Sequence, residues 1–529
     1  MISLLLPRRI KMASKKTGSK AKGIFFLALR ILAYLLAILG SLLTVTLRWL
    51  NDTLGSVSLS TALFQLKTPM VGVDNNIVDM YIKVIGMPAV IKTLIGIFLL
   101  CALTYAMKST GYSLKLGISK LGVLDITYRP VLVFGTLCFL AVCWMKVPAL
   151  LNKVGFPEYV DSIVNRSTLY EDYYVVPTDD LLQFPEQKRN LIVIYVESLE
   201  SSFASVEQGG GMEDSMIPNL YELAQENTSF SDTDTFGGCT QINGVGWTVA
   251  ALLASSSGVT YNVPVGGNDM QTYSVFLPGL RTLGDILKDN GYDNYFACGS
   301  ESFFGGRMAF YNTHGSFTIE DYLYAGNAGY IPEGYHNGVW GMEDYRLFDM
   351  ARTELTNIAQ SGRPFNYMLL TADNHFPDGY ICDYCESVEG ESSLQTAIRC
   401  TDRQVSQFVE WIKEQDWYEN TTVVIIGDHL IMSDEFFDDL PDDYERRVYN
   451  CFLNLPDGLT AYNTHNRSFS TTDYFPTILA AMGVQIEGDR LGLGTNLFSG
   501  QPTLLEQLGE STYNTEVLRY SEYYIDNFT

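Results

Sequence analysis

Three long runs of apolar residues occupy most of the first 151 residues of the chain. Residues 23–49, 84–107 and 130–151 are each long enough to cross the hydrocarbon core of a bilayer as a helix. Two of the runs contain a single lysine, which lies off-centre and can reach the membrane interface. Because three runs recur, a cleaved signal peptide does not account for them. We predict three transmembrane helices, with buried core helices of a soluble protein as the alternative.

After residue 152 the pattern changes from long apolar runs to short segments. Residues 152–189 are polar and rich in tyrosine without a sustained period, which predicts a linker. Beyond them, continuous apolar runs typical of fully buried strands alternate with amphipathic segments typical of helices. The expected strands are residues 190–196, 365–372 and 421–427, and the expected helices are residues 217–227, 394–415 and 470–484. Residues 280–298 are expected to form a helix, a glycine stop and then a strand. The alternation predicts an α/β domain over residues 190–529 with a mostly parallel central sheet and helices on both faces.

Charge divides the chain at nearly the same place. Residues 1–150 carry 17 Lys and Arg against 4 Asp and Glu, whereas the rest of the chain carries 18 against 56. The strongly acidic second part argues against nucleic acid as a partner, because a phosphate backbone binds a basic surface. The first part is basic and apolar, as expected of a region that contacts a lipid bilayer.

The orientation of the three expected spans follows from their basic flanks. Seven Lys and Arg lie within the first 22 residues, and Lys108, Lys115, Lys120 and Arg129 lie between the second and third spans. Basic loops stay on the cytoplasmic side, so both segments are expected there and everything after about residue 152 outside. A weaker apolar stretch at residues 54–66 is a candidate interfacial or re-entrant piece, and it would overturn this topology if it spanned the membrane.

Six of the nine cysteines lie in the part expected to be outside, where disulfides persist. The run "CDYC" contains Cys382 and Cys385, and Cys400 follows it. These three could form a metal knuckle, but no fourth Cys or His has suitable spacing. We expect one local disulfide here, with Cys400 as a member and the pairing left open.

Groups that can bind a metal follow three of the expected strands. Glu197 comes directly after the first strand, Asp373 and His375 follow "FNYMLLTA", and Asp428 and His429 follow "TTVVIIG". Each alone has an ordinary explanation as a loop charge, a cap or a surface histidine. Because the carboxyl ends of parallel strands meet at one edge of a sheet, together they predict a metal site. Oxygen ligands with an imidazole suit Mn²⁺ or Mg²⁺ best, and Zn²⁺ is possible.

A hydroxyl lies at the start of another helix-like segment. "NGVGWTVAALLASSSG" passes from a glycine-rich turn into a run of small apolar residues, and Thr248 lies at the junction. Threonine at such a position is commonly a cap. The preceding glycines would also leave its hydroxyl open to a ligand, so Thr248 is either a cap or a nucleophile.

These motifs resemble those of the alkaline phosphatase/sulfatase superfamily, and within it the membrane-anchored phosphoglycerol transferases and lipoteichoic acid synthases. The similar stretches, in the family's order, are "NLIVIYVESLE", "GWTVAALLASSSGV", "NHFPDGY", "IIGDH" and "TTDYFPTILAAMGV", spread over about residues 190–498. The resemblance implies a sulfatase-like, extracytoplasmic catalytic domain behind the transmembrane helices. The run Cys/Ser-x-Pro-x-Arg of true sulfatases is absent from the sequence.

The resemblance also implies the ligands of one divalent metal ion. Glu197, Asp428 and His429 match the family's metal ligands, and Thr248 matches its threonine nucleophile, which also contacts the metal. An alignment shift would instead place the nucleophile at Thr240 in "GGCTQ".

Two further positions match residues of the family that act on the substrate. His375 and Arg307 match residues that hold the phosphate or stabilise the leaving group, and the spacing around Arg307 is less regular.

The implied reaction is the transfer of a glycerophosphate group from phosphatidylglycerol to an envelope glycan or polymer through a phosphothreonine. A threonine hydroxyl is a weak nucleophile at neutral pH, and a metal and a helix N-terminus both favour its anion. The alternatives are a lipoteichoic acid synthase-like polymerase, a phosphoethanolamine transferase in which His465 supplies an extra ligand, and a non-catalytic sensor. A sensor would be expected to have lost some of the four motif residues.

Overall fold

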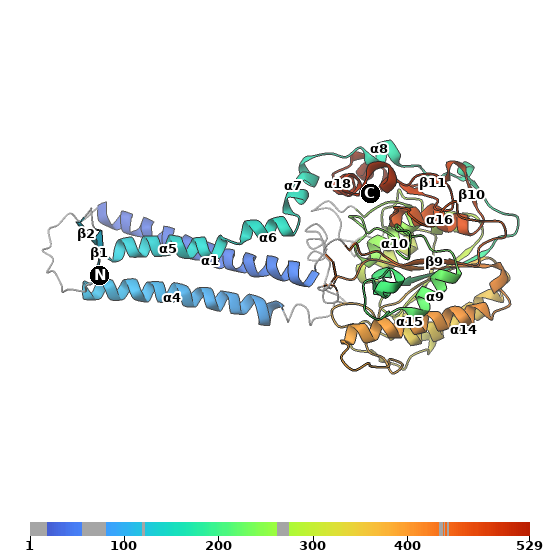
Figure 1. The fold of residues 1–529 in the computed structure, drawn as a ribbon, viewed down its shortest axis with the longest axis horizontal. Coiled ribbons are helices and arrows are strands. Elements are labelled where there is room, and N and C mark those ends of the chain that lie inside the picture. Colours follow the sequence, from blue (N-terminus) through green and yellow to red (C-terminus); the bar gives the residue numbers. More distant parts are fainter. Residues whose placement is uncertain are drawn as a thin grey trace. The chain divides into compact units, whose positions relative to one another are not determined.

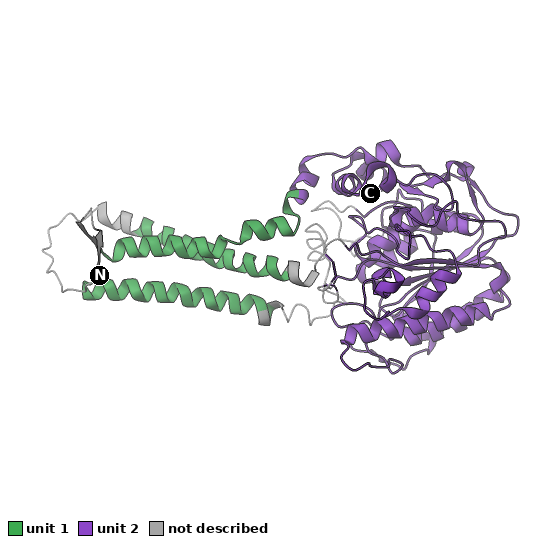
Figure 2. Cartoon of the chain, viewed as in Figure 1, with its two compact units in different colours: residues 1–54, 74–157 green, residues 55–73, 158–529 purple. Residues whose placement is uncertain are grey.

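The structure is a computed structural model that describes residues 18–54, 81–118, 122–261, 275–432 and 444–529, with residues 437, 440 and 441 (Figure 1). The chain forms two compact units, which are described separately. The first comprises residues 1–54 and 74–157, and the second residues 55–73 and 158–529 (Figure 2).

The first unit consists mainly of long apolar helices. Segments Ile24–Trp49, Met87–Thr110 and Tyr128–Lys153 are long and apolar enough to cross a membrane, with mean hydropathies of 2.3, 2.0 and 1.9. At most 11% of each is buried, so their side chains are not those of a soluble core. The structure confirms three apolar helices in this part of the chain. Its elements are α1 (Gly18–Leu54), the π-helix Tyr81–Gly86, α4 (Met87–Thr110), β1 (Leu114–Ile118), β2 (Gly122–Ile126), α5 (Tyr128–Trp144) and α6 (Val147–Lys153).

A close contact joins α1 to α5 within this unit. Trp144 Nε1 donates a hydrogen bond of 2.8 Å to the Leu36 carbonyl. A Cβ atom on Gly40 would lie 2.4 Å from the Trp144 ring, so a glycine is needed for this approach. Residues 55–66 of the candidate re-entrant stretch, and the basic residues before residue 18, lie outside the described residues.

A six-stranded sheet forms the centre of the second unit. Its strands are β6 (Thr318–Glu320), β5 (Asp293–Cys298), β7 (Phe365–Leu370), β4 (Asn190–Val196), β8 (Thr421–Gly427) and β9 (Asn450–Leu453), in that spatial order. The first five run parallel, and β9 pairs with β8 in the antiparallel sense. The predicted α/β class with a mostly parallel central sheet is therefore confirmed. β4 and β8 coincide with the strands expected from the sequence.

The two faces of the sheet are covered by different helices (Figure 1). Alternate residues of β4, namely Leu191, Val193 and Tyr195, belong to one large apolar cluster with residues of α10 (Thr248–Ser257) and α16 (Tyr474–Ala481). The intervening residues Ile192 and Ile194 are fully buried but do not belong to that cluster. That second face is covered by the helices α9 (Pro218–Glu226), α14 (Asp344–Ala359) and α15 (Ser393–Lys413) (Figure 1). Burial on both faces explains why the strand sequences are apolar without interruption.

The remaining elements complete the second unit, and the first of them, α7, begins at the end of the first unit. The helices are α7 (Phe156–Val164), α8 (Leu169–Tyr173), α9 (Pro218–Glu226), α10 (Thr248–Ser257), α11 (Leu283–Asp289), α12 (Arg307–Thr313), α13 (Tyr322–Ala328), α14 (Asp344–Ala359), α15 (Ser393–Lys413), α16 (Tyr474–Ala481), α17 (Leu504–Leu508), α18 (Glu510–Leu518) and α19 (Glu522–Phe528). The short strands are β3 (Leu182–Gln183), β10 (Gln485–Ile486), β11 (Arg490–Leu491) and β12 (Gly494–Thr495).

Two sequence-based expectations differ from the structure. The segment expected to be a linker contains α7, α8 and β3, and Leu169 and Tyr170 are buried in the apolar cluster of the second unit. The expected local disulfide is absent among the described residues, where all nine cysteines are free. The Sγ atom of Cys382 lies 3.5 Å from that of Cys385 and 3.9 Å from that of Cys400, whereas a disulfide needs about 2.05 Å.

Candidate active site

Glu197, Asp428 and His429 come together at the carboxyl ends of β4 and β8. Val196 and Gly427 pair across these strands, so Glu197 and Asp428 leave the sheet side by side. One ligand atom from each of the three residues lies within 4.8 Å of the others, and all three residues are buried. His429 Nε2 is 3.6 Å from Glu197 Oε1 and 3.5 Å from Asp428 Oδ2. The three residues could therefore hold one metal ion.

Neighbouring groups fix the orientation of these side chains. The Ser198 backbone N–H donates to Asp428 Oδ1 over 2.7 Å, and the Ser198 hydroxyl donates to Glu197 Oε1 over 2.7 Å. His429 Nδ1 lies 2.9 Å from the Leu430 carbonyl. With Nδ1 protonated as donor to that carbonyl, the Nε2 lone pair of neutral His429 faces the carboxylates, as in a metal-ligating histidine.

An unsatisfied carboxylate oxygen supports a cation at this place. Asp428 Oδ2 is buried and has no hydrogen-bond partner among the residues that the structure describes. A buried polar atom without a partner is costly, and a bound cation would satisfy it. The donor set of carboxylate oxygens and one imidazole nitrogen fits a divalent metal ion.

The pKa values reflect a concentration of negative charge. Burial, followed by the charge of Glu197, raises the pKa of Asp428 to about 7. Burial alone would raise the pKa of Glu197 too, but the charges of His429 and His375 outweigh it and hold that pKa below its usual value. Burial lowers the pKa of His429, and the charges of Asp428 and Glu197 more than reverse this effect. A divalent cation would neutralise the two carboxylates together.

Thr248 lies beside this cluster as the first residue of α10. Its Oγ1 donates a hydrogen bond of 3.3 Å to Glu197 Oε2, and the residue is half-buried. The cap position is occupied by Trp247, and no side chain caps the helix. The interpretation of Thr248 as a helix cap is therefore wrong, and its hydroxyl faces the acidic cluster at a helix N-terminus, which favours an anion.

Thr240, the other nucleophile candidate, lies in a structural position. It is 4% exposed, and its backbone forms a bridge with Ser470. The next residue, Gln241, accepts a hydrogen bond of 2.7 Å from the Leu430 N–H and so holds the loop that carries His429. The motif "GGCTQ" thus supports the cluster, whereas Thr248 contacts it.

His375 lies near the cluster on the loop after β7. Its charge lowers the pKa of Glu197, and its Nδ1 lies 2.7 Å from the Phe376 carbonyl. The indole of Trp340 lies against it, with ring centroids 4.6 Å apart. Trp340 has no distinctive sequence pattern around it, and nothing in the sequence indicated this position.

Arg307 is the first residue of α12, directly after the loop that follows β5, and it is 5% exposed. Its Nη2 donates to Ser300 Oγ and to the Glu301 carbonyl, each over 2.9 Å. A Cβ on Gly305 would lie 2.9 Å from a methyl group of Val249, so this loop packs against the first turn of α10. The N-termini of α10 and α12, where Thr248 and Arg307 lie, are therefore neighbours.

Asp373 does not join the group of metal-binding side chains. It exchanges hydrogen bonds with Asp344 at the start of α14, where the backbone N–H of each donates to the carboxylate of the other, over 2.9 and 3.1 Å. Burial, with the charge of Asp344, raises the pKa of Asp373 well above its usual value. This pair fixes the loop before His375, and its partner Asp344 was not recognised from the sequence.

Known proteins are similar to this chain over the unit that carries the site. The sulfatase family model matches residues 189–484. Phosphoglycerol transferase I of Xanthomonas campestris pv. campestris is 33% identical over 332 residues, which make up 61% of this chain and 45% of that protein. Phosphoglycerol transferase I of Escherichia coli is 31% identical over 337 residues, 62% of this chain and 41% of that protein. The chain spans less than half the length of these relatives.

Solved structures are similar at lower identity. The lipoteichoic acid synthase LtaP from Listeria monocytogenes is 19% identical with a TM-score of 0.47, and the match covers 63% of this chain and 81% of that one. A protein of the alkaline phosphatase superfamily from Vibrio parahaemolyticus has the same identity and TM-score, with 67% and 80% covered.

Proposed function

The chain belongs to the sulfatase family, as its motifs predict, and we propose that it is a metal-dependent phosphoglycerol transferase. The donor is phosphatidylglycerol, and the acceptor is a hydroxyl group of an envelope glycan or polymer. The names of the curated relatives support a phosphoglycerol group as the one transferred, and three helices long and apolar enough to cross a membrane support a lipid as its donor. The soluble unit acts on the extracytoplasmic side, as the basic flanks of the spans predict.

The proposal rests most on the hydrogen bond from Thr248 Oγ1 to Glu197 Oε2. It places a half-buried hydroxyl directly beside the acidic cluster, at the N-terminus of α10. Glu197, Asp428, His429 and Thr248 itself would hold the metal, which fits the unpartnered Oδ2 of Asp428. The native ion is Mn²⁺ or Mg²⁺, with Zn²⁺ as the alternative. Such an ion, when bound, lowers the pKa of a hydroxyl and withdraws charge from a phosphoryl group.

The chain's own residues then carry the two transfer steps. The Thr248 hydroxyl first loses its proton to solvent, and Oγ1 then attacks phosphorus, so that an oxygen–phosphorus bond forms and the bond from phosphorus to the diacylglycerol oxygen breaks. His375 protonates this leaving oxygen, and Arg307 donates hydrogen bonds to the phosphoryl oxygens. The acceptor hydroxyl next attacks the phosphothreonine, its proton passes to His375, and the threonine oxygen leaves as the alkoxide, ready for the next cycle.

The membrane helices make this donor chemically reasonable. A lipid headgroup lies at the bilayer surface, and a domain tethered there meets it at high effective concentration. A free phosphate ester in solution would gain nothing from such a tether. This consideration favours a lipid donor over a soluble one.

The test uses the full chain in lipid nanodiscs with Mn²⁺ and phosphatidylglycerol labelled in its acyl chains. We expect release of labelled diacylglycerol and none from labelled phosphatidylethanolamine. Release from phosphatidylethanolamine alone would contradict the proposal in favour of a phosphoethanolamine transferase. Release from neither lipid would contradict it in favour of a non-catalytic sensor. Products that grow into glycerophosphate chains would identify a polymerase.

Variants of Thr248 test the nucleophile in the same assay. Thr248→Ala should keep its melting temperature, because the hydroxyl caps no helix, yet lose turnover by on the order of 10⁴-fold. Thr248→Ser should retain part of the activity. Thr240→Ala is the matched control, and it should keep turnover in the fraction that folds. A phosphorylated peptide containing Thr240 in place of Thr248 would reverse the assignment.

A further inference from the structure

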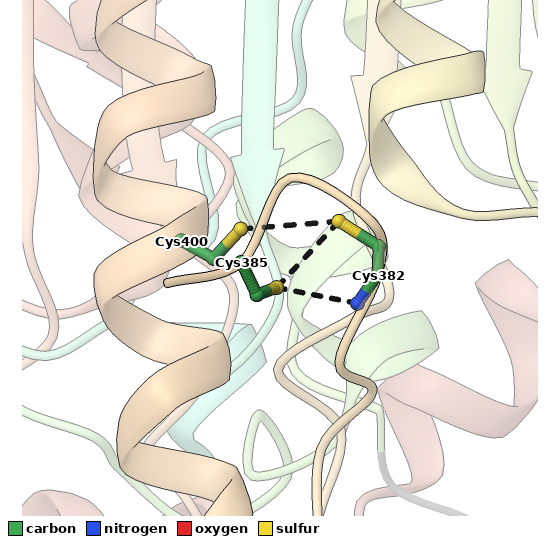
Figure 3. A group of neighbouring side chains, drawn as sticks. All are labelled: Cys382, Cys385 and Cys400. Atoms are coloured by element: carbon green, nitrogen blue, oxygen red, sulfur yellow. Dashed lines mark hydrogen bonds between the residues drawn. The ribbon is translucent and has the colours of Figure 1, made fainter. Parts of the chain in front are cut away.

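Three cysteines form a second cluster of metal-binding side chains, apart from the candidate active site. Cys382 and Cys385 lie on the loop after β7, and Cys400 lies on α15 (Figure 3). Their sulfur atoms all lie within 4.8 Å of one another. Cys382 and Cys400 are 6% and 2% exposed, and Cys385 is half-buried. The cluster is therefore mostly buried, and Cys385 is its most exposed member.

The distances between the sulfur atoms favour a metal site over a disulfide. Cys382 Sγ is 3.5 Å from Cys385 Sγ and 3.9 Å from Cys400 Sγ. A disulfide would need about 2.05 Å. In a tetrahedral site with zinc–sulfur bonds of about 2.3 Å, two sulfur ligands lie about 3.8 Å apart. The observed distances lie on either side of this value.

Gln404 offers a fourth ligand one turn along α15 from Cys400. Its Nε2 lies 3.2 Å from Cys400 Sγ and 3.7 Å from Cys382 Sγ, and the residue is 7% exposed. Its Oε1 is buried without a hydrogen-bond partner among the described residues. Rotating the amide by half a turn exchanges the two atoms and brings Oε1 to the sulfurs. In a tetrahedral zinc site, a sulfur ligand and an oxygen ligand lie about 3.5 Å apart. The distances of 3.2 and 3.7 Å from the Gln404 amide to the two sulfur atoms lie on either side of this value.

Neighbouring donors are suited to thiolate ligands. The Cys382 backbone N–H donates to Cys385 Sγ over 3.2 Å, which favours the deprotonated sulfur (Figure 3). Arg403 donates to the Tyr384 carbonyl over 3.0 Å, so its positive charge lies beside the cysteine loop. Arg403 Nη1 also forms an ion pair of 2.8 Å with Glu386 Oε2. Three thiolates with one divalent ion carry a net charge of −1, and the guanidinium lies between this charge and Glu386.

We propose that Cys382, Cys385, Cys400 and the amide oxygen of Gln404 form a structural zinc site. Three thiolates and one oxygen in a closed tetrahedron select Zn²⁺, and the thiol protons are released on binding. The ion joins the loop after β7 to α15. The same loop is held at its other end by the Thr401 hydroxyl, which donates to Asn374 Oδ1 over 2.9 Å. The site thereby fixes the segment that contains His375, and it goes beyond the proposed catalytic function.

The test measures zinc in the full chain purified in detergent without chelators. The Asp428→Ala variant should bind the candidate active-site metal more weakly, and we expect it to retain a zinc ion at the cysteine cluster. Adding Cys385→Ser to this variant should remove that zinc. Cys451→Ala is the matched control, since Cys451 is buried in β9 outside the cluster, and it should keep the zinc. Loss of zinc in both variants, or the absence of zinc from the Asp428→Ala parent, would overturn the proposal.

Two measurements on the unmutated chain keep the test independent of folding defects. Zinc K-edge X-ray absorption should show sulfur at about 2.3 Å and a lighter ligand at about 2.0 Å. Alkylation should label Cys382, Cys385 and Cys400 only after a chelator is added. Labelling that needs a reductant would show a disulfide instead, and immediate labelling would show free thiols. Either result would contradict the zinc site without bearing on the transferase activity.

Discussion

At the level of single residues, the candidate active site is defined by atoms that lack ordinary partners. The backbone N–H groups of Ser198 and His429 donate to one oxygen of Asp428, and the other oxygen is buried without a hydrogen-bond partner among the described residues. The imidazole Nε2 of His429 faces that oxygen at 3.5 Å. A bound cation would satisfy this oxygen and contact the imidazole nitrogen as well.

The first prediction compares two histidines as metal ligands. His429→Ala should weaken Mn²⁺ binding by more than about tenfold, because it removes a direct ligand. His465→Ala is the matched control: His465 is exposed, and its Nδ1 contacts the Thr464 hydroxyl. Titration of Mn²⁺ followed by electron paramagnetic resonance counts the bound ions. An equal loss in His465→Ala would support the two-metal site of a phosphoethanolamine transferase.

At the level of elements, the edge strand β6 contains an unusual buried acid. Glu320 is 2% exposed, and the Tyr367 hydroxyl of β7 donates to its Oε2 over 2.8 Å. Burial raises the pKa of Glu320 to about 8, although the hydrogen bond from Tyr367 lowers it. The folded protein therefore binds this proton more tightly than the unfolded chain, whose carboxyl has its ordinary pKa.

The second prediction follows from the sign of that shift. Because the pKa of Glu320 is higher in the folded protein than in the unfolded chain, its protonated form stabilises the fold fully at pH values below the unfolded pKa. This stabilisation is lost as pH rises from about 4.5 to about 8, by up to about 1.4 kcal/mol per pH unit. Glu320→Gln removes the titration, so the variant should be more stable than the parent at pH 8.5 and similar at pH 5. Thermal unfolding of the full chain in detergent measures this difference.

Glu333→Gln is the matched control for this prediction, because Glu333 is exposed. It should follow the pH dependence of the parent chain. If Glu320→Gln also followed it, Glu320 would not be the group responsible.

At the level of the whole molecule, the chain combines three apolar helices with an acidic α/β unit. The first 150 residues have a net charge of +13 and the rest −38, from the counts of 17 against 4 and 18 against 56. Basic flanks on a membrane protein stay in the cytoplasm, whereas a long acidic domain is not held there. For the active site to reach the proposed lipid donor, it must lie on the side of the membrane whose leaflet presents that lipid.

The third prediction is the topology that this arrangement implies. A reporter fused after residue 118 should report the cytoplasmic side, and one fused after residue 170 the opposite side, because the third span lies between them. A fusion after residue 529 is the control and should agree with the one at residue 170. The same side at residues 118 and 170 would contradict three spans.

The sequence by itself determined the central strands β4 and β8 and the edge of the sheet at which the candidate site lies. A strand buried on both faces must be apolar throughout, so residues 190–196 and 421–427 were recognisable without a structure. In a parallel sheet their carboxyl ends must meet, which placed Glu197, Asp428 and His429 together.

Only the tertiary structure decided how individual atoms meet. The hydrogen bond between Thr248 and Glu197 joins residues 51 positions apart, and it shows that the threonine hydroxyl faces the acidic cluster and does not cap its helix. The three cysteines lacked a fourth ligand in the sequence pattern, and packing against α15 supplied Gln404, a residue type that no metal-site spacing would indicate. Periodicity records which side of an element is buried. Contacts between distant side chains, and the buried atoms that they leave unsatisfied, depend on how the elements pack.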